Sequence, residues 1–307
     1  RPEAQDVVCR GGQCLVDRCN PGFRDDNGDG ADGCEATWPE NTIFVDQFNG
    51  NPLPDGSAEN PYTTIHAALG GAVSGDTIAV AAGVYRGRIV IYTPNLVLRG
   101  EGMDLVTIDA NDDTGVVVEV RANNVTLTGL TVTGGALGVR FIGNGDGARL
   151  TRGRAYRIRT TNQRPPPAGG NAAGTSAAGF QIQWADRIAI TACEASRITG
   201  GTGGPESLER TPGQDGGPGS GIYVTSSAGA VLDGNIIDDV TGGMGYPPRN
   251  ISRGGYGATG AGIRLNQATG TTITGNTITA IRGGHGGNSA RDSGSPATGG
   301  SGYGIFV

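Results

Sequence analysis

The sequence predicts an all-β fold, a parallel β-helix with three short strands per coil. The first observation is an internal repeat of apolar residues, since Phe180, Ile222 and Ile263 recur at intervals of about 41 residues. The second is that apolar and polar residues alternate within each repeat, as in Ile-Arg-Leu and Thr-Ile-Thr, which indicates β-strands. No repeat has a helical pattern, and repeats of this kind bury their apolar faces by stacking.

Residues 262–281 form the template coil, and its key positions have counterparts in earlier coils. Asn276 corresponds to Asn235, and both precede the third strand, where the chain must bend. Asn tolerates left-handed backbone, and its amide can bond backbone groups along a stack. Cys193 takes the same position and is expected to be a small buried apolar residue rather than a nucleophile. The matched sets are Ile263, Ile273, Asn276, Ile278 and Ile281; Ile222, Leu232, Asn235, Ile237 and Val240; and Phe180, Ile190, Cys193, Ala195 and Ile198.

This pattern resembles the right-handed parallel β-helix of the pectin-lyase-like superfamily, from about residue 41 to the end of the chain. Residues 39–88 are similar to the N-terminal cap of such proteins, with a strand at 42–46 and a short helix that begins at Thr63 or Thr64. We expect this helix to plug the open end of the coils, which would fill residues 89–307. His66 is expected to be a surface or cap residue rather than a catalyst.

Residues 1–38 form a separate module rich in cysteine. Its four cysteines, Cys9, Cys14, Cys19 and Cys34, predict two disulfides with three possible pairings. A structural zinc site is the alternative, but no Cys-x2-Cys pair or nearby His supports it. Disulfides imply an oxidising, extracytoplasmic compartment. The segment also resembles Cys-rich modules of secreted myxobacterial proteins, which implies a bacterial protein outside the cell or on its surface.

A calcium loop is a second possibility within this module. The run Asp-x-Asn-x-Asp-Gly forms the first half of a Ca²⁺ loop, but Ala36 stands where the last ligand, a Glu, is expected. The alternative is an acidic, solvated turn held by the disulfides. The candidate ligands are Asp25, Asn27, Asp29, Asp32 and Glu35, and Ca²⁺ is the only cofactor that we expect.

Long glycine-rich loops are the most informative feature of the later coils. Leu127 and Leu150 mark a basic coil of about 23 residues, whereas later coils repeat after about 41 residues, so each carries an insertion. The insertions follow Thr160, Thr199, Thr241 and Arg282 at one corner, where glycine permits close, polyproline-like packing. The tips of these loops carry the candidate ligand-binding residues, because insertions on one face of a stacked repeat protein often bind partners. The alternative is that the loops only thicken the coil. The candidates are Glu206, Arg210, Asp215, Tyr246, Arg249, Arg253, Tyr256, His285, Arg291 and Asp292.

Composition limits the partners of the chain. The net charge is −6, which disfavours nucleic acid. No apolar run reaches the length of a membrane span. The sequence begins without a signal peptide, as expected of a processed product. It also lacks lysine, so no lysine can serve as a catalytic base or Schiff base.

Enzyme motifs are weak. Asp238-Asp239 and Gly284-His285-Gly286 are similar to motifs of polygalacturonases, but the other elements of that family are absent and the spacing is one long coil. A lyase would need Ca²⁺ or another neutralising group, plus an arginine or lysine base, and lysine is absent. No cluster of Asp residues on consecutive coils is evident, and Asp186, Asp233 and Asp238 are the residues to test.

The sequence therefore favours a secreted or cell-surface structural or adhesive protein that presents stacked loops to a protein or glycan partner. No C-terminal cap follows Gly304-Ile305-Phe306-Val307, so either further sequence is missing or the open end meets something. Head-to-tail assembly of copies into a filament is one hypothesis for the second case. The alternative is a polysaccharide lyase or glycoside hydrolase that acts on acidic glycans.

Overall fold

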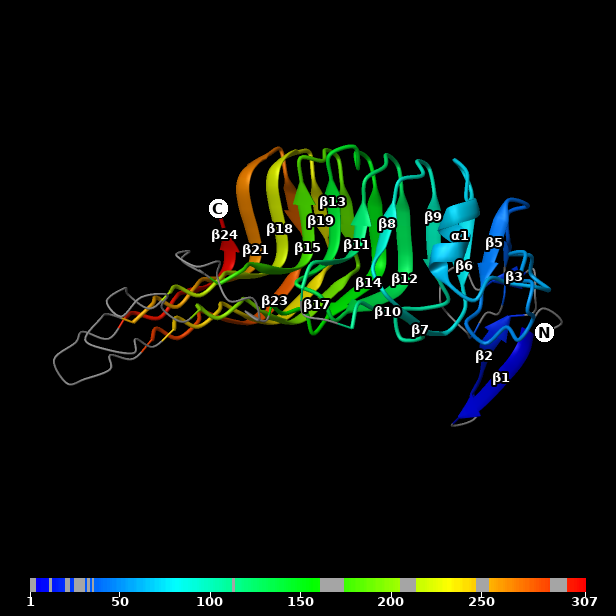
Figure 1. The fold of residues 1–307 in the computed structure, drawn as a ribbon, viewed down its shortest axis with the longest axis horizontal. Helices are drawn as coiled ribbons and strands as arrows, with labels where there is room; N and C mark the ends of the chain where they lie inside the picture. The colour runs from blue at the N-terminus through cyan, green and yellow to red at the C-terminus, as the bar shows by residue number, and fades with distance from the viewer. Residues whose placement is uncertain are drawn as a thin grey trace.

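A computed structural model describes residues 4–10, 13–19, 23–24, 31, 34, 36–111, 114–160, 174–204, 214–246, 254–287 and 297–307. Across this part of the chain, parallel strands stack into an elongated right-handed β-helix, which confirms the predicted fold (Figure 1). The N-terminus lies at one end of the stack, and the coils advance toward β24 at the other.

Two sheets form the walls of the coils. The smaller sheet, which we call the front sheet, contains β8 (Ile89–Ile91), β11 (Val116–Val120), β13 (Leu137–Ile142), β15 (Ala177–Gln183), β18 (Gly219–Ala228), β21 (Gly260–Thr269) and β24 (Gly302–Phe306). The larger sheet contains β5 (Thr42–Val45), β6 (Thr77–Val80), β7 (Gly83–Arg86), β9 (Val97–Gly100), β10 (Val106–Asp109), β12 (Thr126–Thr133), β14 (Arg149–Tyr156), β16 (Ala189–Thr191), β17 (Glu194–Thr199), β19 (Val231–Asp233), β20 (Ile236–Thr241), β22 (Thr272–Thr274) and β23 (Thr277–Arg282).

The larger sheet bends to cover two faces, so each later coil has the three predicted strands, such as β18, β19 and β20. Residues that the sequence repeat aligns are also partners in the observed strand register. Ile222 pairs with Ile263, and Leu232 pairs with Ile273. Residues at one phase therefore stack inside the coil, and Phe180, Ile222 and Leu232 are fully buried there. Burial of this apolar ladder is the main stabilising contribution, at about 1.5–3 kcal/mol per large side chain.

The bend before the third strand uses a different residue from the one expected. Gly234 and Gly275 carry the positive φ (63° and 62°), with Ala192 at the same corner (50°). Asn235 and Asn276 follow them with ordinary backbone, so the expectation that Asn takes up the left-handed conformation is wrong. The other half of the expectation is right, since their amides bond backbone groups along the stack.

The N-terminal helix α1 (Ile65–Gly71) begins after Thr64, whose hydroxyl accepts a hydrogen bond from Ala67 N at 3.2 Å. Ile65 and Ala68 are buried against the first coil, as expected of a capping helix. β5, β6 and β7 already pair in the parallel sheet, so parallel strands also run through the predicted cap region.

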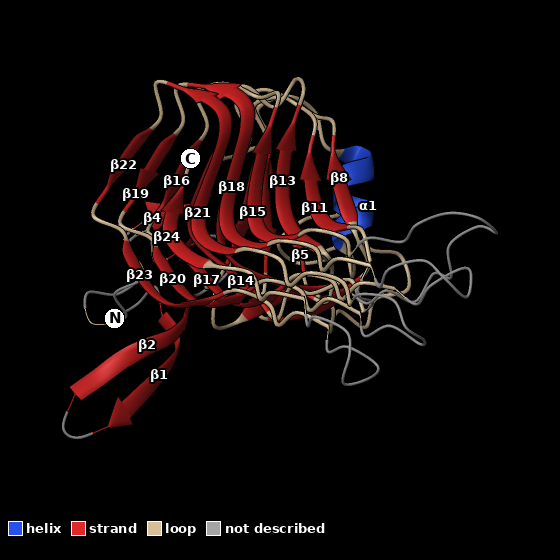
Figure 2. Cartoon of the chain, turned by 90° about the vertical axis from the view of Figure 1, so that its left-hand side faces the viewer, coloured by secondary structure: helices blue, strands red, loops and turns tan. Residues whose placement is uncertain are grey.

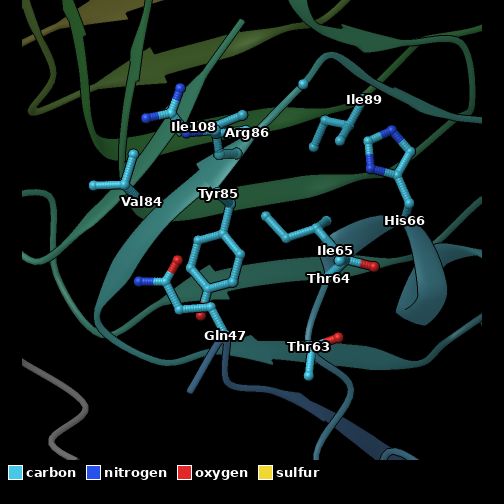
Figure 3. A pocket seen from close by; sticks show the side chains of 11 residues that line it. Gln47, Thr63, Thr64, Ile65, His66, Val84, Tyr85, Arg86, Ile89 and Ile108 are labelled. Atoms are coloured by element: carbon cyan, nitrogen blue, oxygen red, sulfur yellow. The ribbon is translucent and has the colours of Figure 1, made fainter. Parts of the chain in front are cut away.

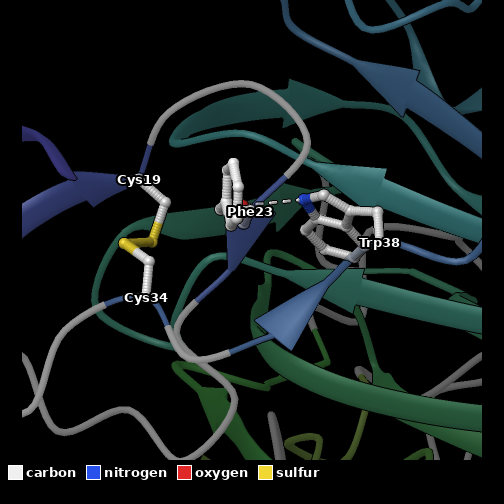
Figure 4. The surroundings of a disulfide bond; sticks show 4 residues. All are labelled: Cys19, Phe23, Cys34 and Trp38. Carbon is white, nitrogen blue, oxygen red and sulfur yellow. Dashed lines mark hydrogen bonds between the residues drawn. A yellow bond between two sulfur atoms is a disulfide. The ribbon is translucent and has the colours of Figure 1, made fainter. Parts of the chain in front are cut away.

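The N-terminal module contains two short antiparallel pairs, β1 (Ala4–Arg10) with β2 (Gln13–Cys19) and β3 (Phe23–Arg24) with β4 (Ala36–Thr37). Cys19 and Cys34 form a disulfide (Figure 4), and the backbone register of the hairpin places Cys9 opposite Cys14. The Trp38 indole donates to the Phe23 carbonyl at 3.0 Å and packs edge-on against Phe44 of β5. Trp38 therefore contacts both the module and the first coil. The five candidate calcium ligands lie outside the described residues.

Candidate binding surface

The insertions leave the coils at one corner and return to it. We call residues 200–204, 242–246 and 283–287 the entry legs, and residues 174–176, 214–218, 254–259 and 297–301 the return legs. The entry legs follow β17, β20 and β23, and the return legs lead into β15, β18, β21 and β24. The legs extend side by side from the lower corner of the coils (Figures 1 and 2). Together they form a surface that we call the glycine shelf.

Hydrogen bonds between neighbouring legs repeat every three residues. Gly200 N donates to Thr241 O and, three residues on, Gly203 N donates to Met244 O. The return legs repeat the pattern, since Gly216 N and Gly219 N donate to oxygens that are also three residues apart, on Tyr256 and Thr259. A period of three is that of the polyproline II helix, as the sequence predicted.

A second set of hydrogen bonds joins the entry legs to the return legs. These bonds form one zigzag through the shelf, with donor–acceptor distances of 2.7–2.9 Å. Of every three residues along a leg, one thus bonds to a neighbouring leg of the same kind and one bonds to a leg of the other kind. The third residue faces solvent. The zigzag runs from Gly300 through Gly284, Ala258, Gly243, Gly217 and Gly201 to Thr175.

Close approach of the legs explains the glycines. A Cβ on Gly243 would collide with the Gly201 carbonyl, and one on Gly217 would collide with the carbonyl of Thr175. These neighbours are backbone atoms and cannot rotate away, so a larger residue would force the legs apart. Polyproline II helices pack at this separation only where glycine is present.

The solvent-facing positions of the shelf form two short rows. Thr202, Met244 and His285 are exposed along the entry legs, and Asp215, Tyr256 and Thr298 are exposed along the return legs. Asp215 and Tyr256 are brought together, because the Asp215 carboxylate accepts the Tyr256 backbone N–H at 2.7 Å. His285 belongs to the other row, and Tyr246 is half-buried. Of the other predicted tip residues, Glu206, Arg210, Arg249, Arg253, Arg291 and Asp292 lie outside the described residues.

The front sheet carries a row of polar and aromatic side chains that the sequence analysis did not single out. Glu119, Arg140, Gln181, Tyr223 and Arg264 are successive partners in register. They alternate with inward-facing residues, which is the signal that could have found them. The Arg264 guanidinium lies 5.2 Å from the Tyr223 ring centroid and 5.5 Å from that of Phe306.

Glu119 is the acid of this row, and its side chain is almost buried. Burial opposes its ionisation, but hydrogen bonds from Arg140 and Arg121 outweigh burial and lower the pKa of the carboxyl below its ordinary value. Glu119 is therefore an ionised partner of two arginines, an arrangement that stabilises the sheet rather than supplying an acid catalyst.

The carboxylates considered for catalysis have structural partners. Asp233 and Asp238 each accept a hydroxyl of the next coil at 2.6 Å, from Thr274 and Thr279 respectively. Asp186 accepts Ala228 N at 2.8 Å. Asp239 pairs with Arg282 at 3.2 Å.

Cys193 does not provide a nucleophile either. Burial raises the pKa of its thiol to about 12, and the thiol lies 3.2 Å from the Thr191 carbonyl. Within the described parts of the chain, no three His, Cys, Asp or Glu side chains are close enough together to hold a metal.

A cavity of about 320 Å³ lies between the capping helix and the first coil (Figure 3). Gln47, Thr64, His66, Tyr85, Arg86 and Ile108 are among the residues that line it. His66 Nε2 is 2.8 Å from the Arg88 carbonyl, and the Tyr85 hydroxyl donates to the Ala81 carbonyl at 2.9 Å. The His66 contact thus holds the capping helix against the strand that follows Arg88, whereas the Tyr85 bond is local to the turn after β6.

No protein-family model matches the sequence, and no curated protein matches it. Solved structures similar to the chain include the pectin methylesterase PemA from Erwinia chrysanthemi, with TM-score 0.36 and 11% identity over 77% of this chain and 82% of that one. Pectate lyase Pel9A has TM-score 0.34 and 14% identity over 77% and 78%. An alginate lyase from Paenibacillus sp. str. FPU-7 has TM-score 0.32 and 15% identity over 78% and 95%. At such scores, the fold assignment depends on the strand pairing of this chain itself.

No helix in the described ranges has the length and apolar character needed to cross a membrane.

Proposed function

We propose that this protein is an extracellular binding scaffold, a rigid β-helix whose glycine shelf presents loop tips to a glycan or protein on a surface. The observation that supports this proposal is the three-residue hydrogen-bond pattern that joins seven successive legs. Such a lattice fixes the backbone up to the point where each tip begins.

A fixed backbone favours binding because little conformational entropy is lost when a partner docks. The exposed rows of the shelf also have mixed chemistry. Tyr256 and Asp215 on the return legs, and His285 on the entry legs, provide ring, carboxylate and imidazole groups suited to hydroxyl-rich or peptide ligands.

An extracellular location fits the chemistry of the N-terminal module. The Cys19–Cys34 disulfide is of the kind that persists in oxidising compartments and is rare in a reducing cytosol. Binding outside the cell is therefore the setting that we propose.

A polysaccharide-cleaving enzyme is the less supported alternative. Retaining and inverting hydrolases need a pair of carboxyl groups that face one substrate. Asp186, Asp233, Asp238 and Asp239 instead bond to backbone or neighbouring side chains, as described above.

The experiment combines binding and cleavage assays. Wild-type protein, Gly243→Ala and Gly304→Ala are applied to a glycan array and to bacterial surface extracts, and acidic polysaccharides are assayed for cleavage. A Cβ at position 304 meets no atom within 4 Å, so Gly304→Ala controls for the added methyl group. We expect binding by the wild type and the control, weakened in Gly243→Ala, without cleavage. Turnover of an acidic polysaccharide, or equal binding by all three proteins, would contradict the proposal.

A further inference from the structure

Trp184 combines two unfavourable features at one position. It follows β15 at a corner of the coil, where its φ is 52°, and its side chain is 61% exposed. A positive φ is uncommon for a bulky residue, and an exposed indole gains little from burial. Because the positive φ recurs at this corner in other coils, the exposed indole is the feature that the turn itself does not explain.

The fold itself does not require an aromatic residue at this corner. The register that pairs Gln183 with Thr225 and Thr225 with Asn266 makes Ser226 and Gln267 the counterparts of Trp184. Gly143 is the counterpart in the preceding coil. All of these share the left-handed backbone, with φ between 49° and 59°. A glycine, a serine and a glutamine thus form the same turn.

The surroundings of Trp184 offer space and neutral hydrogen-bonding groups. No atom lies within 4 Å of the point where a Gly143 Cβ would stand. On the other side, the Ser226 hydroxyl donates to Gln267 Oε1 at 3.1 Å. Adjacent coils are about 4.8 Å apart, so these groups lie within reach of a ligand that covers the indole.

The charged groups near this corner are already engaged. Arg187 lies 3.7 Å from Asp146, and Asp146 also accepts the backbone N–H of Asp186 at 2.8 Å. Asp186 in turn accepts Ala228 N. The corner is therefore an aromatic face with hydroxyl and amide neighbours and without an unpaired charge among these groups.

We propose that Trp184 is the stacking platform of a binding site for a neutral sugar. The C–H face of a pyranose would pack on the indole, while its hydroxyls would exchange hydrogen bonds with the Ser226–Gln267 pair. The site deepens the proposed binding function, on which it rests, and lies on a corner other than that of the glycine shelf. A protein partner fits less well, because a protein hot spot usually has an apolar core around its aromatic anchor.

The test uses tryptophan fluorescence and a backbone-matched variant. The chain has two tryptophans, so Trp38→Phe leaves Trp184 as the only one. This variant is titrated with cellohexaose, xylohexaose and hexagalacturonate, and the same sugars and a neutral glycan array are applied to wild type, Trp184→Phe and Trp184→Gly. Glycine suits a positive φ, so Trp184→Gly is expected to keep or raise the melting temperature.

We expect a neutral glycan to shift the Trp184 emission. The affinity for this glycan should fall about tenfold or more in Trp184→Gly. Trp184→Phe should retain part of the wild-type affinity, because phenylalanine keeps an aromatic ring. The proposal would be overturned if no neutral glycan bound more weakly to Trp184→Gly than to the wild type. It would also be overturned if hexagalacturonate alone shifted the Trp184 emission. A cell-attachment assay distinguishes a protein partner. If attachment depends on Trp184 and survives periodate oxidation of the cell-surface glycans, the partner is a protein and the sugar-binding proposal is wrong. Gly243→Ala should leave this site intact. Unchanged binding in Gly243→Ala together with weakened binding in Trp184→Gly would therefore contradict the proposed shelf function and not the Trp184 site.

Discussion

Asn235 and Asn276 are joined through one amide oxygen across neighbouring coils. Asn276 Oδ1 accepts the backbone N–H of Asn235 at 3.0 Å and its side-chain N–H at 2.8 Å. Asn235 Oδ1 accepts the backbone N–H of Cys193 at 3.0 Å in the same way. Each Asn also donates inward to a carbonyl, Asn235 to Ile190 and Asn276 to Leu232. The ladder therefore satisfies backbone groups around the buried side chain of Asn235.

Asn235→Ala is expected to lower the free energy of unfolding by about 2–4 kcal/mol, because the change leaves the Cys193 N–H without its side-chain acceptor and removes a hydrogen bond to the Ile190 carbonyl. Chemical denaturation followed by circular dichroism measures the difference. Ser226→Ala, at a half-buried position of the preceding corner, is the control and should change stability by less than about 1 kcal/mol. Equal effects of the two changes would contradict a structural role for the ladder.

Cys193→Asn is expected to extend the ladder by one coil. The thiol is a weak donor 3.5 Å from the Leu150 carbonyl, in the place where Asn235 donates to Ile190. An amide of similar volume should form that bond and stabilise the fold by about 0.5–1.5 kcal/mol. Cys193→Ser, which is smaller and cannot reach as far, serves as the comparison. A lower denaturation midpoint for Cys193→Asn than for the wild type would mean that the coil cannot accept the amide.

The Cys193 thiol should not react with a thiol reagent in the folded protein. Because burial raises its pKa to about 12, the thiol stays protonated through pH 9 and is shielded from solvent. Incubation with Ellman's reagent should therefore label it only at the rate of unfolding, and at once in guanidinium. Rapid labelling of native protein at pH 8 would show that the corner opens.

Glu119→Gln should lower stability at pH 7 by about 1–3 kcal/mol, since it leaves Arg140 without its charged partner. The pKa of Glu119 is lowered by folding, so its contribution is present above the ordinary value of about 4.3 and is lost as pH falls through the folded pKa. The difference in stability between the two proteins should thus shrink as the pH falls below the ordinary pKa of a glutamate. Thermal melts from pH 3 to 7 check this, and a constant gap across that range would contradict the assigned ionisation.

Gly262 and Gly304 occupy the same register position in successive coils. A Cβ on Gly262 would collide with Ile278 and lie 2.6 Å from the Gly304 carbonyl, whereas a Cβ on Gly304 meets open space. Gly262→Ala is therefore expected to cost about 1–3 kcal/mol or more, and Gly304→Ala close to nothing. Comparison of their melting temperatures tests the packing, and similar values would show that the coil relaxes around the methyl group.

The coil and the position of its insertions could be predicted from the amino-acid sequence. Ile222 and Ile263 could be aligned without coordinates because stacked coils repeat their inward residues at one phase. The same offset located the start of each loop at Thr199, Thr241 and Arg282. The glycines on both sides of each loop also predicted polyproline-like packing, since only glycine permits backbones to approach so closely.

The atoms that meet between coils became known only from the folded chain. The pairing of Glu119 with Arg140, the left-handed Gly234 in place of Asn235, and the bond from Gly243 to Gly217 all depend on how neighbouring coils and legs pack. Trp184 looked like an ordinary aromatic residue in the sequence, and its exposure and positive φ appeared only at the folded corner. A repeat fixes which positions stack, because apolar burial has a period. It does not fix hydrogen bonds, ion pairs or backbone strain, because these depend on distances and angles that the packed coils set together.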